Sequence, residues 1–269
     1  MRELIIIGGG PAGLSAAITA RQRDLSAVVI SNDRAQSGLY KASEIGNYPG
    51  LPAISGRELS DRLTQHAQDA GAEFIAGQAN TIVPAGDSVN VCVGTDIYMA
   101  RSVILATGIA QTSVFPGEEE LLGRGVSYCA TCDGMFFRGK KVCVVCLKPD
   151  AEDEAEYLAS IGCDVIRTTA QNIAIKGETS VTSVVADGGE IICDGVFILR
   201  KTIAPNLLLP GLDTENGHIR AGKSAETNIR GVFAAGDCTG TPYQISKAAG
   251  EGQVAALSAA EYILSAGKR

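Results

Sequence analysis

The chain opens with an apolar run that passes directly into a glycine-rich turn. Residues 4–7 are continuously apolar, as is typical of a strand buried in a parallel sheet. A turn at 8–13, a helical stretch at 14–21 and a second apolar run at 27–30 follow. This order predicts a βαβ unit, the building block of a parallel sheet with helices on its faces.

The same pattern recurs later in the chain. Residues 103–108 and 231–237 read as strands that end in Ala-Thr-Gly and Gly-Asp, and an alanine-rich helix is expected over about 246–264. Between them, 139–145 and 164–167 read as two further strands, and 57–70 as an amphipathic helix. Strands alternating with helices indicate an α/β fold.

The first turn matches a dinucleotide fingerprint in the required context of strand, turn and helix. Gly8 permits the tight turn, Gly10 lets the backbone approach a pyrophosphate, and Gly13 lets the helix pack on the strand. The helix N-terminus then offers amide donors to the phosphates. The alternative, a glycine-rich turn that binds nothing, remains open at this point.

A Cys-x-x-Cys pair followed by a carboxylate stands at Cys129, Cys132 and Asp133. Side chains three positions apart are neighbours on a helical turn, so the two sulfurs can close a disulfide there. Thiolate pKa values are lowered in such motifs, and Asp133 is placed to give protons to the sulfurs. A redox dithiol beside a nucleotide site indicates that electrons move from a bound cofactor to a disulfide.

Composition limits the number of domains, the cellular compartment and the kinds of partner to be expected. The 269 residues suit one or two domains, and eight cysteines in a chain of this length do not indicate a disulfide-stapled secreted scaffold. No signal peptide and no membrane-spanning stretch fit the sequence, so we expect a reducing, cytoplasmic setting and no membrane contact. A net charge of −7 argues against a nucleic-acid partner. Four cysteines lack metal-ligand spacing and are expected in the core, so no metal site is predicted: Cys92, Cys163, Cys193 and Cys238.

Taken together, these segments resemble the low-molecular-weight thioredoxin reductases. The resemblance covers essentially the whole chain and includes the loop at 44–50, Ala-Pro-Asn at 204–206 and Gly-Glu-Gly-Gln at 250–253. It implies a two-lobed flavoprotein disulfide reductase fold. The Rossmann-like FAD-binding domain would comprise 1–112 and 203–269, and a shortened, degenerate NADPH-type domain carrying the redox-active disulfide would comprise 113–202.

The resemblance also implies the roles of individual residues. Cys132 would face the flavin, Cys129 would attack the disulfide of the protein substrate, and Asp133 would protonate the leaving thiolate. FAD would be held by the two strand ends, the glycine-rich turn, the 44–50 loop and the start of the last helix: Gly8, Gly10, Pro11, Ala12, Gly13, Asn47, Ala106, Thr107, Gly108, Gly236, Asp237, Tyr243, Gln244 and Ile245.

The second nucleotide fingerprint of that family is degenerate in this chain. After the strand at 139–145, Cys146 and Lys148 replace the two glycines that allow a pyrophosphate to approach, and three acidic residues follow at 152–154. Only Arg167 remains of the arginines that grip the NADPH 2′-phosphate. Residues 139–206 are also few for a nucleotide domain, which needs roughly a hundred or more.

This pattern resembles the ferredoxin-dependent flavin thioredoxin reductases. The expected function is therefore reduction of thioredoxin or a thioredoxin-like protein, with reduced ferredoxin as donor, by a homodimer. Three alternatives stay open: a conventional NADPH-dependent reductase, a flavin oxidase that passes electrons to oxygen, and a non-enzymatic redox flavoprotein.

The remaining cysteines and histidines have simpler structural explanations. Cys143 and Cys146 also spell Cys-x-x-Cys, but on a strand their Cα atoms would lie roughly 10 Å apart, too far for a disulfide. Both are expected to be small core residues, and His66 and His218 surface residues. Candidates for a basic docking patch for an acidic protein are Arg138, Lys140, Lys141, Lys201 and Lys247.

Overall fold

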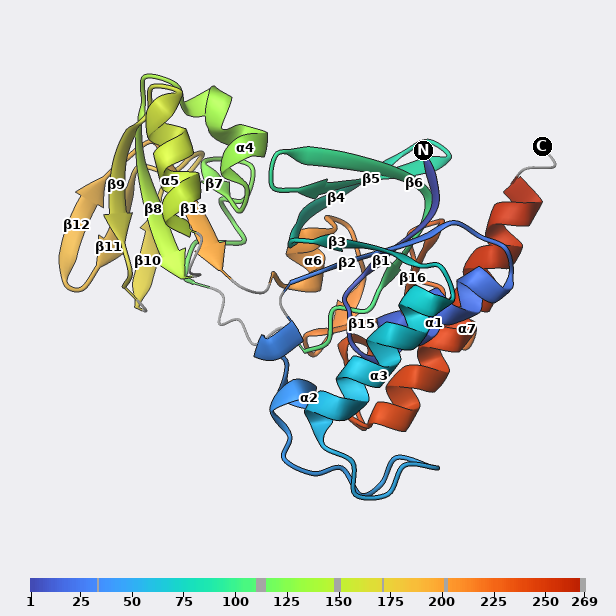
Figure 1. Cartoon of the computed structure of the whole chain (residues 1–269). Coiled ribbons are helices and arrows are strands. Elements are labelled where there is room, and N and C mark those ends of the chain that lie inside the picture. Colours follow the sequence, from blue (N-terminus) through green and yellow to red (C-terminus); the bar gives the residue numbers. More distant parts are fainter. Residues whose placement is uncertain (33, 110–114, 148–150, 171, 201–202, 267–269) are drawn as a thin grey trace. The chain divides into compact units, whose positions relative to one another are not determined.

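The chain forms two compact units (Figure 1), residues 1–110 with 204–269, and residues 111–203. The computed structural model describes the whole chain except residues 33, 110–114, 148–150, 171, 201–202 and 267–269, and it does not describe the side chains of Thr131 and Cys132. Each unit is described below by itself.

The first unit is built on a seven-stranded sheet in the order β3-β2-β1-β6-β5-β4, with β16 paired to β6. The long β6 belongs to two arrangements. Its second half is parallel to β1 and β16, and its first half is antiparallel to β5. The strands are β1 (Arg2–Ile7), β2 (Ala27–Ser31), β3 (Glu73–Ala76), β4 (Ala79–Ala85), β5 (Ser88–Val93), β6 (Asp96–Leu105) and β16 (Val232–Ala234).

Three helices lie side by side on this sheet, with α1 between α3 and α7 (Figure 1). Alanines line the interface of α1 and α7, so the two helices approach closely. A Cβ at Gly252 would overlap the carbonyl oxygen of Ala12, which shows contact at backbone distance. The helices are α1 (Pro11–Gln22), α2 (Gly38–Lys41), α3 (Gly56–Asp69), α6 (Pro205–Leu208) and α7 (Ile245–Ala266), with the hairpin β14 (Thr214–Glu215) and β15 (His218–Ile219).

The second unit holds a parallel sheet in the order β7-β13-β8-β9 and an antiparallel sheet in the order β10-β11-β12. Every residue of β13 is buried, as expected of a central strand. The strands are β7 (Val126–Ser127), β8 (Lys141–Leu147), β9 (Asp164–Thr168), β10 (Ile173–Lys176), β11 (Ser183–Ala186), β12 (Gly189–Ile192) and β13 (Gly195–Arg200). The helices are α4 (Ala130–Asp133) and α5 (Ala151–Ser160), and α5 connects β8 to β9.

The predicted α/β fold is confirmed, and the predicted strands and helices are present. The largest difference is at β6, which begins at Asp96 rather than near 103. Its first four residues, 96–99, are exposed or half-buried and pair with β5 alone, so this part lacks the continuous apolar run that marks the second half. Within the described part of the chain, no helix is both long and apolar enough to cross a membrane.

Candidate active site

The glycine-rich turn leaves the N-terminus of α1 open to a ligand. Gly8 has φ of +118°, and a Cβ there would overlap the carbonyl oxygen of Ala106. The end of β1 is therefore pressed against the end of β6. Around Gly10 a Cβ would meet nothing within 4 Å, and no side chain caps the helix. Free amides and unfilled space at a helix N-terminus suit a pyrophosphate.

The turn after β16 meets this loop. The amide of Ala235 donates to the Leu105 carbonyl at 2.9 Å, and a Cβ at Gly236 would lie 2.8 Å from the Ala12 Cβ. Asp237 follows, and its Oδ1 is buried without a hydrogen-bond partner among the described residues. Burial raises the pKa of this carboxyl group. Buried polar atoms normally have a partner, so the orphaned oxygen fits a ligand hydroxyl such as those of the ribityl chain of FAD.

A lysine and a glutamate on α7 hold this turn in place. Lys247 Nζ donates to the carbonyl oxygens of Gly236 and Gly240 at 3.1 and 2.7 Å, and it lies 3.3 Å from Glu251 Oε1. Glu251 Oε2 accepts from the Gly236 amide at 2.8 Å and from Thr239 Oγ1 at 2.9 Å. The expectation that Lys247 belongs to a basic docking patch is therefore wrong, because its ammonium group is used inside the fold.

The structure brings together other predicted cofactor residues that lie far apart in sequence. Asn47 Nδ2 donates to Gln244 Oε1 at 2.8 Å, directly before α7 begins at Ile245. Tyr243 is 41% exposed, and its hydroxyl lies 2.7 Å from His218 Nε2. Thus the loop at 44–50 is joined to the residue directly before α7.

The redox motif lies at the start of α4 in the second unit. Cys129 is disulfide-bonded and only 2% exposed. The side chain of its predicted partner, Cys132, falls outside the described part of the chain. Asp133 Oδ2 accepts a hydrogen bond from Ser127 Oγ at 2.6 Å, and the same Oγ accepts from the Cys129 amide at 3.1 Å.

A buried charged network adjoins the motif. Glu118 is fully buried, and its carboxylate accepts from Arg200 Nη2 at 2.8 Å, from the Phe115 amide at 2.8 Å and from Tyr128 Oη at 2.9 Å. Burial first, and then the neighbouring Glu118, raises the pKa of the Tyr128 hydroxyl. Arg200 also stacks over the Phe115 ring, with Cζ 4.9 Å from the centroid.

The second Cys-x-x-Cys pair is not a disulfide. Cys143 and Cys146 are free thiols on β8, as predicted; Cys143 is fully buried and Cys146 partly buried. Burial raises the pKa of Cys143 to about 12, and the pKa values of Cys193 and Cys238 to about 11. Such thiols are unreactive near neutral pH.

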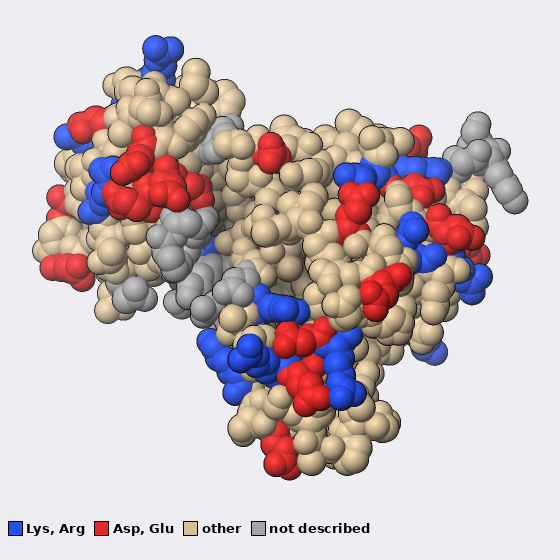
Figure 2. Space-filling model, in the orientation of Figure 1, with Lys and Arg blue, Asp and Glu red and all other residues tan. Residues whose placement is uncertain are grey.

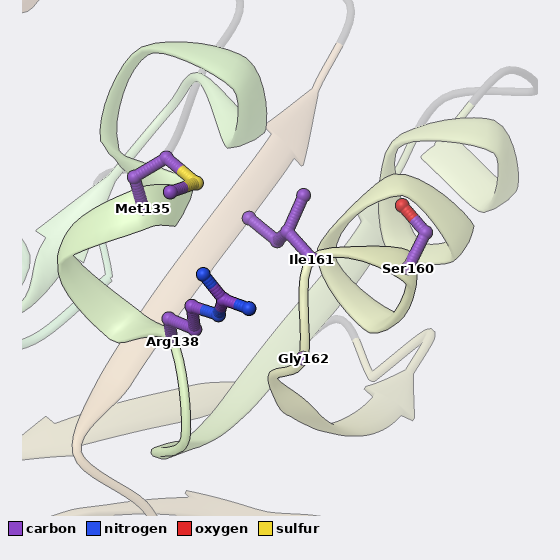
Figure 3. A pocket seen from close by; sticks show the side chains of 5 residues that line it. All are labelled: Met135, Arg138, Ser160, Ile161 and Gly162. Carbon is purple, nitrogen blue, oxygen red and sulfur yellow. The ribbon is translucent and has the colours of Figure 1, made fainter.

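Exposed apolar side chains follow the redox motif directly. Met135 is 56% exposed and Phe136 is 74% exposed. Met135 and Arg138 face Ser160 and Ile161 across a hollow between the 134–138 segment and the end of α5 (Figure 3). Arg138, Lys140 and Lys141 are exposed, with Lys141 Nζ 3.5 Å from Asp164, whereas Lys201 lies outside the described residues.

Sequence reasoning missed three groups that the structure places at these sites. Ser127, the Lys247–Glu251 pair and the Glu118 network all act through side-chain hydrogen bonds. Of these, only the Lys247–Glu251 ion pair had a signal in the sequence, because residues four apart on a predicted helix are neighbours. Among the described residues, no group of three or more metal-ligating side chains is present.

Comparisons with known proteins agree with this geometry. The chain matches the family described as pyridine nucleotide-disulphide oxidoreductase over residues 2–166 and 148–252. It is 33% identical to a thioredoxin reductase of Bacillus subtilis, covering 97% of this chain and 94% of the relative. Its structure matches a ferredoxin-flavin thioredoxin reductase from Clostridium acetobutylicum with a TM-score of 0.87 and 38% identity, covering 98% of both chains. It also matches a thioredoxin reductase from Gloeobacter violaceus with a TM-score of 0.73 and 29% identity, covering 98% of this chain and 95% of the other. The chain therefore belongs to the pyridine nucleotide-disulphide oxidoreductase family and, within it, to the low-molecular-weight thioredoxin reductases, which are FAD-binding flavoproteins.

Proposed function

We propose that this thioredoxin reductase takes its electrons from reduced ferredoxin and passes them to thioredoxin through a Cys129/Cys132 dithiol. The observation that carries the thiol assignment is the disulfide at Cys129, at the start of α4 and three residues before Asp133. The two cysteines on β8, Cys143 and Cys146, are free thiols, and Cys143 is fully buried, so this pair offers no second route for electrons to thioredoxin.

FAD is proposed to bind in the first unit, residues 1–110 with 204–269, and the disulfide to belong to the inserted unit. The open amides at the start of α1, from Gly10 to Gly13, would hold the pyrophosphate, and Asp237 would accept from a ribityl hydroxyl. Asn47 and Gln244, already paired, would line the flavin side. When bound, FAD supplies two electrons for reduction of the disulfide.

The residues of the inserted unit then carry out thiol–disulfide exchange. The Cys129 thiolate attacks one sulfur of the thioredoxin disulfide, forming a mixed disulfide and releasing one thiolate. Cys132 attacks the Cys129 sulfur, which releases the second thioredoxin thiolate and re-forms the Cys129–Cys132 disulfide. Two electrons pass to thioredoxin, and Asp133 exchanges protons with the sulfurs.

The donor proposal depends on the start of α5, where a pyridine nucleotide would need to dock. The first turn carries Glu152, Asp153 and Glu154, and acidic side chains gather over this helix (Figure 2). Arg167, the remaining arginine of the 2′-phosphate site, lies 2.5 Å from Glu152 Oε1. Negative charge at the helix start and an already paired arginine both oppose a phosphorylated dinucleotide. The turn at 148–150 lies outside the described residues.

Energetics favour ferredoxin as a donor. A plant-type ferredoxin near −400 mV and a thioredoxin near −270 mV differ by roughly 130 mV, or about 6 kcal/mol for two electrons. A protein carrier that passes electrons to the flavin needs no nucleotide-binding fold. The ferredoxin-flavin enzyme of Clostridium acetobutylicum, similar over 98% of this chain, supports the same assignment.

Anaerobic reduction of the holoenzyme tests the donor. Flavin absorbance is followed after mixing with NADPH, NADH or reduced ferredoxin, each with and without thioredoxin. Reduced ferredoxin is expected to bleach the flavin and to support thioredoxin reduction, while neither nucleotide does so on the same timescale. Rapid bleaching by micromolar NADPH would assign a conventional NADPH-dependent enzyme, and peroxide formation without thioredoxin turnover would assign an oxidase.

Thioredoxin is proposed to dock on the exposed apolar side chains beside the disulfide. Met135 and Phe136 follow the motif, and large apolar side chains left open to water mark interaction sites. Phe136→Ser is expected to raise the KM for thioredoxin while leaving flavin reduction by ferredoxin unchanged. Ile192→Ser is the matched control, because Ile192 is 67% exposed on β12 of the same unit. Equal effects of the two substitutions on KM would contradict this docking surface.

The chain is further proposed to act as a homodimer. Val254, Leu257 and Leu264 on α7 are 38%, 37% and 67% exposed, and such a stripe is suited to a second copy. Light scattering of the holoenzyme is expected to give the mass of two chains. A wild-type monomer would refute this assignment, and a Leu257→Glu dimer would show that the interface lies elsewhere.

A further inference from the structure

A buried hydroxyl group links the backbone of the redox cysteine to the adjacent acid. Ser127 ends the short strand β7 and is 2% exposed. Its Oγ lies 2.6 Å from Asp133 Oδ2, and it accepts the amide hydrogen of Cys129 at 3.1 Å. One side chain therefore touches both parts of the redox motif.

The geometry fixes the direction in which the hydroxyl proton points. Among the described side chains and backbone, two acceptors lie within reach of Ser127 Oγ, namely Asp133 Oδ2 at 2.6 Å and the Cys129 carbonyl oxygen at 3.3 Å. The carboxylate is the closer and the stronger acceptor, since hydrogen bonds to charged groups are shorter and stronger than neutral ones. The incoming bond from the Cys129 amide polarises the hydroxyl further in the same sense.

The position of Ser127 is itself set by the sheet. Ser127 pairs with Phe197 on β13, the fully buried central strand of the unit. Asp133, by contrast, ends a helix of four residues and is only partly buried. The strand thus supplies a rigid anchor for a carboxylate on a short element.

We propose that Ser127 is a positioning residue, which holds the Asp133 carboxyl group where it exchanges protons with the redox sulfurs. This rests on the function proposed above. When the Cys129 disulfide is reduced, its S–S bond breaks, two electrons from the flavin enter the sulfurs, and two protons complete the thiols. One of these protons passes through the Asp133 carboxyl group, whose Oδ2 is held by the Ser127 hydroxyl.

The test is a double-mutant cycle on the holoenzyme, with Ser127→Ala, Asp133→Asn and both together. Thioredoxin reduction is driven by electrochemically reduced methyl viologen, a donor that needs no docking site, with an enzyme-free blank subtracted. Ser127→Ala is expected to lower kcat about ten- to a hundredfold, the worth of one hydrogen bond to a charged group. The KM for thioredoxin should change less than about twofold, because the hydroxyl is buried.

Two further readouts separate positioning from simple loss of structure. The double variant should be no slower than Asp133→Asn alone, because Ser127 acts only through that carboxylate. Ser127→Thr, which keeps the hydroxyl, should recover most of the loss. The matched control is Ser183→Ala, since Ser183 is also 2% exposed and donates to Glu190 Oε1 at 2.6 Å on the other sheet of the unit. It should leave kcat unchanged.

Each outcome points to one conclusion. Two outcomes would overturn the role of Ser127 and leave that of Asp133 intact. One is that the losses of kcat in the two single variants add up in the double variant. The other is a Ser127→Ala enzyme as fast as wild type beside a slow Asp133→Asn enzyme. An Asp133→Asn enzyme with wild-type kcat would remove Asp133 from proton transfer, and the role of Ser127 with it. A wild-type protein that never reduces thioredoxin would instead refute the proposed function.

Discussion

Replacing Glu118 by glutamine is expected to destabilise the unit formed by residues 111–203 by about 3–5 kcal/mol, the usual cost of removing one partner from a buried ion pair. The carboxylate is fully buried, and Arg200 is only 6% exposed. Glutamine has nearly the shape of glutamate, but it leaves the buried Arg200 guanidinium without a negative charge beside it. Its NH₂ group is also a donor, whereas both oxygens of the Glu118 carboxylate accept hydrogen bonds. The three donors, the Phe115 amide, Arg200 Nη2 and Tyr128 Oη, all lie within 2.9 Å of the present oxygens.

Hydrogen exchange is the suitable measurement, because a chain of two units does not unfold in a single two-state step. The opening free energy of amides in β7 and β13 is compared between wild type and variant. Asp164→Asn is the control, since it removes an ion pair of the same unit that is exposed, with Lys141 and Asp164 47% and 65% accessible. An exposed pair is worth only about 0.2–1 kcal/mol. A loss below about 1 kcal/mol in Glu118→Gln, or one equal to that of the control, would show that the buried pair does not stabilise this unit.

Three further predictions concern the thiols and the cofactor site. Cys143→Ser should keep thioredoxin turnover, whereas Cys129→Ser should abolish it; loss of turnover in a folded Cys143→Ser enzyme would overturn the assignment of the thiols. Because burial raises the pKa of Asp237, the wild-type apoprotein gains stability as pH falls through that raised pKa and loses it as pH rises. Asp237→Asn should therefore melt higher than wild type at pH 7, by a margin that shrinks on acidification, and a margin independent of pH would contradict this. Lys247→Met removes the bonds that hold the Gly236 turn and should weaken FAD binding, measured by flavin fluorescence on titration of the apoprotein; unchanged affinity would refute this role.

The parts of the structure that were predictable follow from local patterns. The apolar run of β1, the turn at Gly8 and the helix α1 are encoded within about twenty neighbouring residues, and the motif at Cys129 is encoded within five. The prediction that Cys143 and Cys146 form no disulfide with each other followed from strand geometry alone, and both are free thiols.

The parts that escaped prediction depend on partners remote in sequence. Asn47 meets Gln244 across 197 positions, and Glu118 meets Arg200 across 82. Charged residues are expected at the surface unless they are paired, and no local pattern shows that Glu118 has a partner. Lys247 was misassigned for the same reason, since the carbonyl oxygens that bind it belong to a turn and carry no signature of their own.

The pairing of Glu118 with Arg200 inside one unit also bears on the order in which the two units fold during synthesis. Arg200, the last partner of Glu118, is made before residues 204–269, so the inserted unit can close while synthesis continues. The first unit cannot close at that stage, because β16 and α7 follow the inserted unit in the chain and α1 lacks its alanine-lined neighbour until they are made. Domains fold as units as the chain emerges. The unit formed by residues 111–203 is therefore expected to be native in the nascent chain before the first unit is complete.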